Sequence, residues 1–380
     1  MKRVFAILLF MILLLTTVSC GKGQEAPTEA PADDKQATFT QQCESAMKST
    51  LVQGTAYAVV NGEEILSLSN GKADKKADAD NSADAVYQFA SITKQFTAAA
   101  IMRLYEDGKL DLQDTIDQYF PSYPAGKDIT IHMLLCMRAG LPDYINNETD
   151  TVMIYDDSDI PYEIRKDKTA AQNRAAIEDW LFSQELLFTP DTQFAYSNSA
   201  YLLLGEIIEQ VSGTTYQEYL TATFLQPLGM SSAGFYDAYD NKDVTVAKAY
   251  SRGEDADWLE YPGTRFGCGD LLCSPKDLAK WGAALLDGKV VSADSWKKMT
   301  TPYSTDAEGE NGGYGYGLAI SETEEGVKVI SHTGHFPSYF SMLLLIPDYH
   351  YAGVTVSNHS DSTAVGLCTK IAKLYYNDPF

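Results

Sequence analysis

The sequence is short of positive charge. Its 29 lysines and arginines stand against 52 aspartates and glutamates, which gives a formal net charge of -23 at pH 7. A surface with this charge repels phosphate backbones and anionic lipid headgroups, so neither nucleic acid nor an anionic membrane surface is expected as a partner. An anionic substrate would have to meet a local basic site.

Two kinds of catalytic signature are also missing. No Gly-x-Ser-x-Gly sequence occurs, which argues against the alpha/beta-hydrolase class of serine enzyme. Of the five histidines, His332 and His335 come closest to a metal-binding pair, but they lie three residues apart on an extended segment with no carboxylate nearby. We therefore expect no metal and no organic cofactor.

Long apolar runs are scarce, and the longest, Val4–Leu15, is too short to span a bilayer as a mature helix. It follows two basic residues, so residues 1–19 are predicted to be a signal peptide. The run ends near Cys20 in a sequence that resembles a bacterial lipobox, in which the cysteine carries lipid; an ordinary cleavage site with an incidental cysteine is the alternative. Residues 20–38 are predicted to be a disordered, lipid-anchored linker on the outer face of the cytoplasmic membrane. A secreted or periplasmic protein is the alternative location.

Residues 39–380 are predicted to form one large domain, because 45% of the chain is hydrophobic and such a length can bury a sizeable core. If Cys20 carries lipid, five cysteines remain, and an odd number excludes a fully paired disulfide framework within one chain. Cys268 and Cys273 have no histidine near them in sequence, so we expect either a facultative disulfide or two buried thiols.

Five Ser-x-x-Lys spacings occur, and only the one at Ser91 has a catalytic context. Ser19 falls in the signal peptide and Ser69 in a polar turn that follows the predicted hairpin of residues 54–68. Ser45 lies in a predicted amphipathic helix and Ser295 in a short helical segment, and both serine-lysine pairs are expected to be exposed. Ser91, by contrast, follows an extended apolar segment and begins a helix.

A serine at a helix start with a lysine three residues later can act without a histidine. Lys94 lies one turn along on the same face, so its amine can reach the Ser91 hydroxyl. Burial and the positive end of the helix both disfavour the ammonium form, so a neutral amine can accept the serine proton. Backbone N–H groups at the same helix end can stabilise a developing oxyanion.

Two companion motifs follow along the chain. Tyr196-x-Asn198 lies at a junction between a loop and a helix, and His332-Thr333-Gly334 joins two strand-like segments. In this order the three motifs resemble those of the serine beta-lactamase and penicillin-binding-protein superfamily, in its class C beta-lactamase and D-alanyl-D-alanine carboxypeptidase branch. Gly140–Tyr144 is similar to a further recurring phrase of that superfamily, and the likeness covers about residues 40 to 375.

The resemblance implies an α+β, beta-lactamase/transpeptidase-like fold, in which an antiparallel sheet is flanked by helices and a mainly helical subdomain is inserted. The active site would lie between the sheet and this subdomain. Helices and loops are accordingly expected between residues 92 and 300.

The resemblance also implies roles for the site residues. Ser91 would form an acyl-enzyme, with either Lys94 or Tyr196 as the general base. Asn198 would bind the substrate amide, and His332, Thr333 and Gly334 would border the substrate. The backbone N–H groups of Ser91 and His335 would form the oxyanion hole.

The expected substrates are D-Ala-D-Ala peptides, beta-lactams or small esters. His332 stands where many beta-lactamases of this branch have lysine, so a carboxypeptidase or esterase is favoured over a dedicated lactamase. Arg138 is either a contact for a substrate carboxylate or an ordinary surface arginine. A penicillin-recognising binding protein or sensor that acylates with little turnover is the alternative function.

Overall fold

The computed structural model describes residues 33–50, 52–146, 164–251, 254–255, 261–304, 312–336, 338–360 and 363–377. The predicted signal peptide and Cys20 lie outside these residues. Within them, no helix has both the length and the apolar character needed to cross a bilayer.

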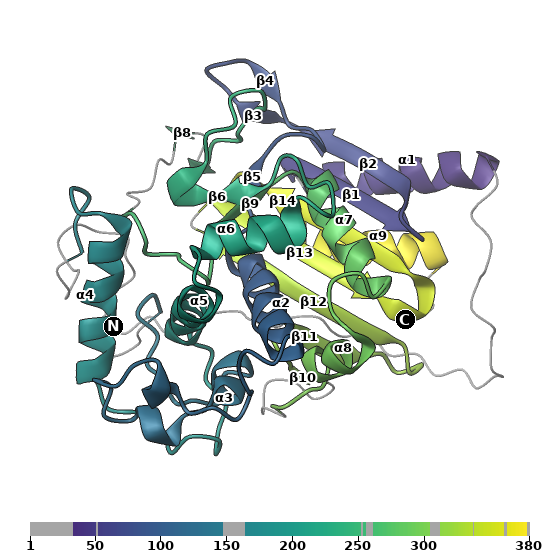
Figure 1. The fold of residues 1–380 in the computed structure, drawn as a ribbon. Coiled ribbons are helices and arrows are strands. Elements are labelled where there is room, and N and C mark those ends of the chain that lie inside the picture. The colour runs from purple at the N-terminus through teal and green to yellow at the C-terminus, as the bar shows by residue number, and fades with distance from the viewer. Residues whose placement is uncertain are drawn as a thin grey trace, which may run out of the picture.

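A seven-stranded antiparallel sheet forms the centre of the molecule (Figure 1), which confirms the predicted fold class. Its strands, in spatial order, are β10 (Gly312–Tyr314), β11 (Ala319–Glu322), β12 (Lys328–Phe336), β13 (Tyr339–Ile346), β14 (Tyr351–Ser357), β1 (Gly54–Val60) and β2 (Glu63–Asn70). The first and last parts of the chain therefore pair with each other, because β1 lies beside β14.

The predicted hairpin is confirmed as β1 and β2. Asn61 and Gly62 join the two strands with φ values of 53° and 78°. Two consecutive positive φ angles match the right-handed twist of the strands, and asparagine and glycine adopt them at low cost.

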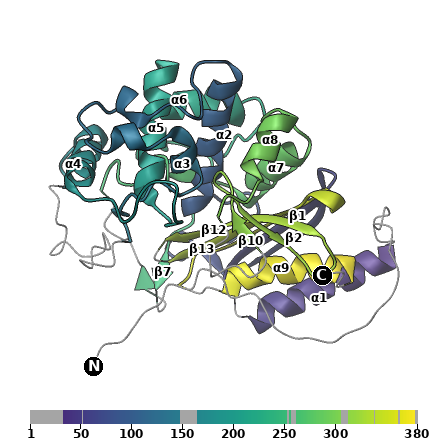
Figure 2. The ribbon, with the colours of Figure 1, turned by 90° about the horizontal axis from the view of Figure 1, so that it is seen from below.

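Two terminal helices, α1 (Asp33–Ser49) and α9 (Thr363–Tyr376), cover one face of the sheet (Figure 2). The linker predicted for residues 20–38 is thus too long at its C-terminal end, since residues 33–38 are helical. Tertiary contacts explain this: the Gln36 side chain donates a hydrogen bond of 2.7 Å to the carbonyl oxygen of Ile65, and Phe39 packs edge-on against Tyr375. Neither contact can be read from the composition of the segment.

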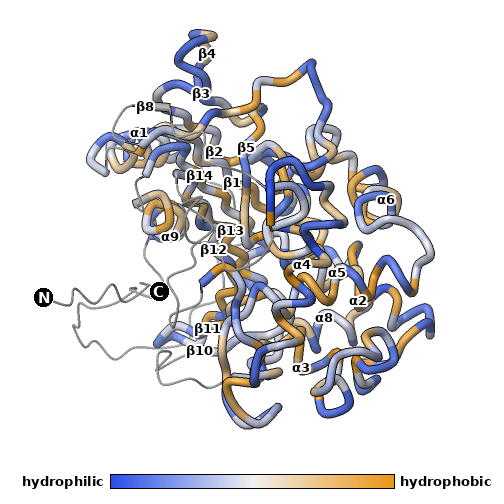
Figure 3. Tube along the Cα trace, turned by 90° about the vertical axis from the view of Figure 1, so that its left-hand side faces the viewer, coloured by the Kyte–Doolittle hydropathy of each residue, from blue (hydrophilic) through white to orange (hydrophobic). Residues whose placement is uncertain are grey.

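The opposite face of the sheet carries the larger helical region, as predicted for residues 92 to 300. Its helices are α2 (Thr93–Glu106), α3 (Ile131–Leu135), α4 (Ala170–Ser183), α5 (Asn198–Ser212), α6 (Tyr216–Leu220), α7 (Pro275–Leu286) and α8 (Ala293–Met299). Trp281 of α7 stacks on Phe96 of α2 with 3.8 Å between the ring centroids, so α2 is fixed beneath the sheet. Figure 3 shows apolar segments along α2 and α5 and in β12 and β13.

The remaining elements are short. They are the strands β3 (Lys72–Asp74), β4 (Ala79–Asp80), β5 (Tyr87–Gln88), β6 (Gly234–Phe235), β7 (Tyr250–Ser251), β8 (Glu254–Asp255) and β9 (Leu271–Cys273), the 3-10 helices η1 (Ala90–Ile92), η2 (Ile116–Gln118), η3 (Gly126–Asp128), η5 (Tyr236–Ala238) and η6 (Pro347–Tyr349), and the π-helix η4 (Thr221–Leu225). Strand β9 pairs with β5 on one side and β6 on the other, next to the start of α2.

Candidate active site

Ser91 lies in a tight turn between β5 and α2. We predicted a helix beginning at Ser91, whereas the structure has the 3-10 helix η1 there and begins α2 at Thr93. Ala90, directly before the serine, is buried and has a φ of +46°, a left-handed conformation that costs a non-glycine residue energy. Such strain persists where surrounding contacts impose it, and it is common at catalytic turns.

Lys94 is fully buried, and its amine lies within hydrogen-bond distance of three oxygen atoms. Its Nζ atom donates to Ser91 Oγ at 3.1 Å, to Asn198 Oδ1 at 2.8 Å and to the Cys268 carbonyl oxygen at 2.8 Å. Because the other two hydrogen bonds fix the amine, its distance from the serine oxygen is set by the fold rather than by the flexible side chain. The structure thus brings together the predicted Ser91, Lys94 and Asn198.

The sequence did not identify Asp143, which holds Asn198 from behind. The Asn198 amide nitrogen lies 3.1 and 2.9 Å from the two carboxylate oxygens of the buried Asp143. These bonds orient the amide so that its oxygen faces Lys94. The only sequence signal was that Asp143 lies within the phrase Gly140–Tyr144.

Tyr196 stands just before α5, whose first turn is capped by the Ser197 side chain. The centre of the Tyr196 ring lies 5.0 Å from the Lys94 Nζ atom. Burial raises the pKa of Tyr196, while Lys94 and Ser91 act in the opposite direction. The phenol is therefore protonated at neutral pH and is placed to give a proton.

His332 is buried in β12 and carries no charge at neutral pH. Its Nδ1 lies 2.6 Å from the Thr333 carbonyl oxygen, so this nitrogen carries the proton, and its Nε2 then accepts from the Tyr314 hydroxyl at 3.0 Å. Burial first, and then the neighbouring Lys94, lower the pKa of His332 to about 3. From the sequence we predicted only that a histidine stands here in place of the lysine of many beta-lactamases. Tyr314 had no signal in the sequence beyond its glycine-rich surroundings.

The edge of β12 runs past Ser91. Strand β11 pairs with β12 only up to Ser331, so the segment from His332 to Phe336 extends beyond that ladder. Gly334 permits the close approach, since a Cβ atom there would lie 2.1 Å from the Phe89 carbonyl oxygen. The backbone of the predicted oxyanion-hole residue His335 follows directly, and its role stays a prediction.

The Arg138 side chain is held by Asp191 and Tyr303. Its Nε donates to Asp191 Oδ1 at 2.6 Å, a second guanidinium nitrogen binds the Asp191 carbonyl oxygen, and a third contacts the Tyr303 carbonyl oxygen. These contacts agree with the alternative in which Arg138 is an ordinary surface arginine.

Cys268 and Cys273 are both buried free thiols, which favours two buried thiols over a disulfide. Among the described residues, no three His, Cys, Asp or Glu side chains are grouped to hold a metal ion.

The competing Ser-x-x-Lys spacings lack this environment. Lys48, the partner of Ser45, has a side chain that is 76% exposed. Ser69 and Lys72 lie in β2 and β3 rather than in one turn, and Lys72 pairs with acidic side chains.

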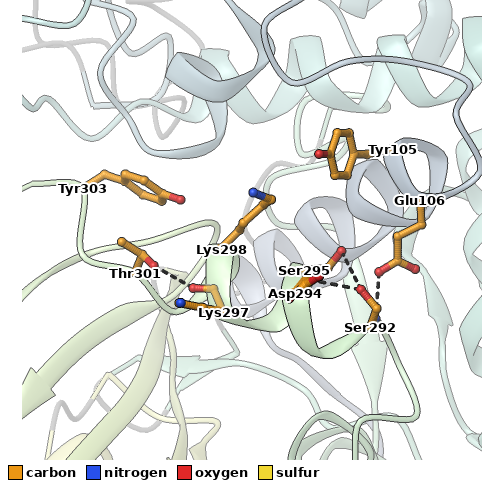
Figure 4. A pocket seen from close by; sticks show the side chains of 9 residues that line it. All are labelled: Tyr105, Glu106, Ser292, Asp294, Ser295, Lys297, Lys298, Thr301 and Tyr303. Carbon is orange, nitrogen blue, oxygen red and sulfur yellow. Dashed lines mark hydrogen bonds between the residues drawn. The ribbon is translucent and has the colours of Figure 1, made fainter.

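The prediction for Ser295 is wrong, because this serine is 1% exposed and lines a cavity of about 570 Å³ at the ends of α2 and α8 (Figure 4). Its backbone N–H and hydroxyl both meet the Ser292 side chain, at 3.2 Å each. Within the described chain no hydrogen bond joins Ser295 to Lys298, and the Ser295 N–H instead donates to Ser292, the N-cap residue of α8.

Comparison with known proteins agrees with this geometry. A family model described as Beta-lactamase matches residues 39–374. The chain is 29% identical to a putative penicillin-binding protein, PbpX, of Bacillus subtilis, and the match covers 72% of this chain and 64% of PbpX. It is 25% identical to penicillin-binding protein 4* of the same organism, and that match covers 82% of this chain and 69% of the relative. It thus spans about two thirds of these relatives. The octameric penicillin-binding protein homologue from Pyrococcus abyssi superposes with a TM-score of 0.76 at 28% identity, over 90% of this chain and 77% of that one.

Proposed function

Because the chain belongs to the beta-lactamase family, we propose that it is a serine hydrolase working through an acyl-enzyme on Ser91. The observation that carries the proposal is the 3.1 Å contact between Lys94 Nζ and Ser91 Oγ, in which the amine is fixed by two further acceptors. This is hydrogen-bond distance for a proton transfer from nucleophile to base.

The steps follow from the positions of the side chains. Ser91 Oγ attacks the substrate carbonyl carbon while its proton passes to Lys94, because the Tyr196 phenol is already protonated. The backbone N–H groups of Ser91 and His335 stabilise the oxyanion, and Tyr196, protonated at neutral pH, gives its proton to the leaving oxygen or nitrogen. Lys94 then passes the proton that it took from Ser91 on to Tyr196. Water attacks the acyl carbon, one of its protons reaches Ser91 Oγ through Lys94 as the acyl bond breaks, and the acid product leaves.

Small esters are the substrates that the site supports best among D-Ala-D-Ala peptides, beta-lactams and esters. His332 is neutral, and Arg138 is held by Asp191, so neither offers a positive charge to a substrate carboxylate. A leaving group without a carboxylate binds equally well whether or not the site has a free cation. The carboxylate of a D-alanine peptide or a penicillin, by contrast, has no cation here with which to form an ion pair.

The test is a hydrolysis panel combined with intact mass. We expect turnover of a chromogenic ester, slower turnover of a penicillin and of a D-Ala-D-Ala peptide, and a transient adduct on Ser91. Ser91→Ala should abolish both adduct and turnover, and Ser45→Ala, with the same spacing on an exposed helix surface, should change neither. Full turnover by Ser91→Ala would refute the mechanism, and a lasting penicillin adduct without product would identify a sensor instead.

We also propose that the protein is exported and anchored by lipid on Cys20. The support is the sequence alone: the short apolar run, the lipobox-like Thr17–Gly21 and the polar segment that follows. Membrane fractionation of cells that express the full chain tests this. Cys20→Ala should move the protein from the membrane to the soluble exported fraction, and unchanged partitioning would contradict the anchor.

A further inference from the structure

None of the residues that line the cavity at the ends of α2 and α8 belongs to the site around Ser91. The cavity has a volume of about 570 Å³, a size typical of pockets that take small organic ligands. Its lining side chains end in hydroxyl, amine or carboxylate groups, and none of them is aliphatic (Figure 4). Such a wall suits a polar, hydroxylated ligand such as a sugar better than an apolar one.

Lys298 extends into this cavity without an acidic partner. In Figure 4 its amine lies between the hydroxyl ends of Tyr105 and Tyr303. No carboxylate of the described residues forms an ion pair with it, whereas acidic partners are present for Lys72, Lys276, Lys280 and Lys289. A half-buried lysine without such a partner is unexpected in a chain with 52 acidic and 29 basic residues.

The two carboxylates of the cavity leave this amine unpaired. Glu106 accepts from the Ser292 N–H at 2.7 Å and lies 3.6 Å from the Arg103 guanidinium. Asp294 is exposed and stands four positions before Lys298 on α8, but no ion pair joins the two in the part of the chain that the structure describes. Exposed pairs with this spacing are weak, so a ligand can compete with Asp294 for the amine.

The groups on the Tyr303 side of the cavity do not neutralise Lys298 either. The Tyr303 ring meets the His132 ring edge-on, with 4.7 Å between the ring centroids. Burial lowers the pKa of His132, and Lys298 adds to this effect, so the imidazole is uncharged at neutral pH. Arg138 and Asp191, whose charges also act on His132, are paired with each other. The positive charge of Lys298 is therefore left for a ligand.

A second donor lines the same space. The Tyr105 side chain is half-buried, and its hydroxyl makes no hydrogen bond to any described residue. An amine and a phenol hydroxyl that both lack an acceptor form a pair of donors, which is what an anionic oxygen requires.

We propose that this cavity binds a small sugar-like ligand that carries a carboxylate or phosphate group. The anionic group would lie at Lys298 and Tyr105, and hydroxyl groups of the ligand would face the serine and threonine side chains of the wall. Lys297, exposed in the last turn of α8, stabilises the negative end of that helix and is not needed for the site. The site is separate from the acyl-enzyme chemistry proposed for Ser91, and its test needs no turnover.

Titration calorimetry at low ionic strength tests the site with three probes. We expect glucuronate and glucose 6-phosphate to bind, and glucose, which has a similar ring without the charge, to bind at least about tenfold more weakly. The tighter of the two anions identifies the preferred group. A high concentration of sodium chloride should weaken both, because salt screens the attraction to Lys298.

Single substitutions locate the binding. Lys298→Gln should weaken both anions about tenfold and Tyr105→Phe about threefold. Asp294→Asn removes a neighbouring negative charge and should strengthen binding. Lys289→Gln changes an exposed lysine that is paired with Asp287, so it is the matched control and should bind like the wild type.

Two results would overturn the proposal. One is that neither anionic sugar binds more tightly than glucose, and the other is that Lys298→Gln binds both anions as the wild type does. Because the Lys298 side chain makes no hydrogen bond to a described residue, we expect this variant to fold, and its Tm checks that it does. If it does not fold, loss of binding in Tyr105→Phe and its gain in Asp294→Asn decide instead.

Discussion

The buried, neutral His332 predicts an unusual loss of stability in acid, which His332→Gln should remove. In the unfolded chain a histidine takes up a proton near pH 6.5, whereas in the fold burial and Lys94 lower the pKa of His332 to about 3. Between these values the unfolded state binds one more proton than the folded state. Stability conferred at this position is therefore complete above about pH 6.5 and is lost as the pH falls toward 3.

The size of the effect follows from the same two values. Each pH unit in this window costs about 1.4 kcal/mol, so lowering the pH from 6.5 to 4 removes roughly 3 kcal/mol of unfolding free energy through His332. His332 is 6% exposed, so solvent screens little of the electrostatic effect on its pKa. Glutamine cannot take the proton, and its side-chain oxygen can still accept from the Tyr314 hydroxyl.

Urea unfolding at pH 7 and at pH 4 measures the difference. Carboxylates elsewhere titrate in both proteins, so their contributions to the unfolding free energy cancel when the wild type is compared with His332→Gln. We expect the midpoint of the wild type to fall by about 1 M more than that of His332→Gln. His350→Gln, which removes an exposed histidine, is the matched control. If wild type and His332→Gln lose stability in parallel, His332 is not the buried neutral group described, and the argument against carboxylate recognition fails with it.

Three further substitutions test the scaffold around the nucleophile. Asp143→Ala leaves the Asn198 amide nitrogen without its carboxylate partner, so kcat for a chromogenic ester should fall 10- to 100-fold with little change in KM. Gly334→Ala places a Cβ atom 2.1 Å from a backbone oxygen and should both lower the Tm and slow acylation at least 100-fold, whereas Gly366→Ala, with open space in α9, should do neither. Ala90→Gly relieves the left-handed φ before the nucleophile and should raise the free energy of unfolding by up to about 1 kcal/mol in urea titrations.

The sequence predicted what depends on local pattern and on the order of motifs. The hairpin at Asn61 follows from a two-residue turn signal, and Ser91 could be chosen among five equal spacings because an extended segment and a helix flank it. The site residues Asn198 and His332 were found by the order of their motifs along the chain. None of these inferences required knowing how distant segments pack.

What the sequence could not predict depends on contacts across the fold. The acceptors that fix Lys94 lie 104 and 174 positions away, and one of them is a backbone carbonyl, which leaves no trace in residue type. Asp143 acts through a second residue and so carries no spacing signal. Ser295 was predicted to be exposed on a short helical segment, but α8 packs against the end of α2 and buries it.

The neutral state of His332 and the hydrogen bonds of Lys94 together change how a substrate must bind. All three direct acceptors of Lys94 are uncharged, and the Asp143 carboxylate reaches it only through Asn198. A lysine in place of His332 would put a second amine into the same pocket, beside Lys94. With histidine there, attraction between opposite charges contributes little to substrate binding. We therefore expect backbone hydrogen bonds from the extended edge of β12 to contribute most of the binding free energy. The KM for an uncharged ester should therefore change little between low and high ionic strength, since salt screens charges and leaves short hydrogen bonds almost unaffected.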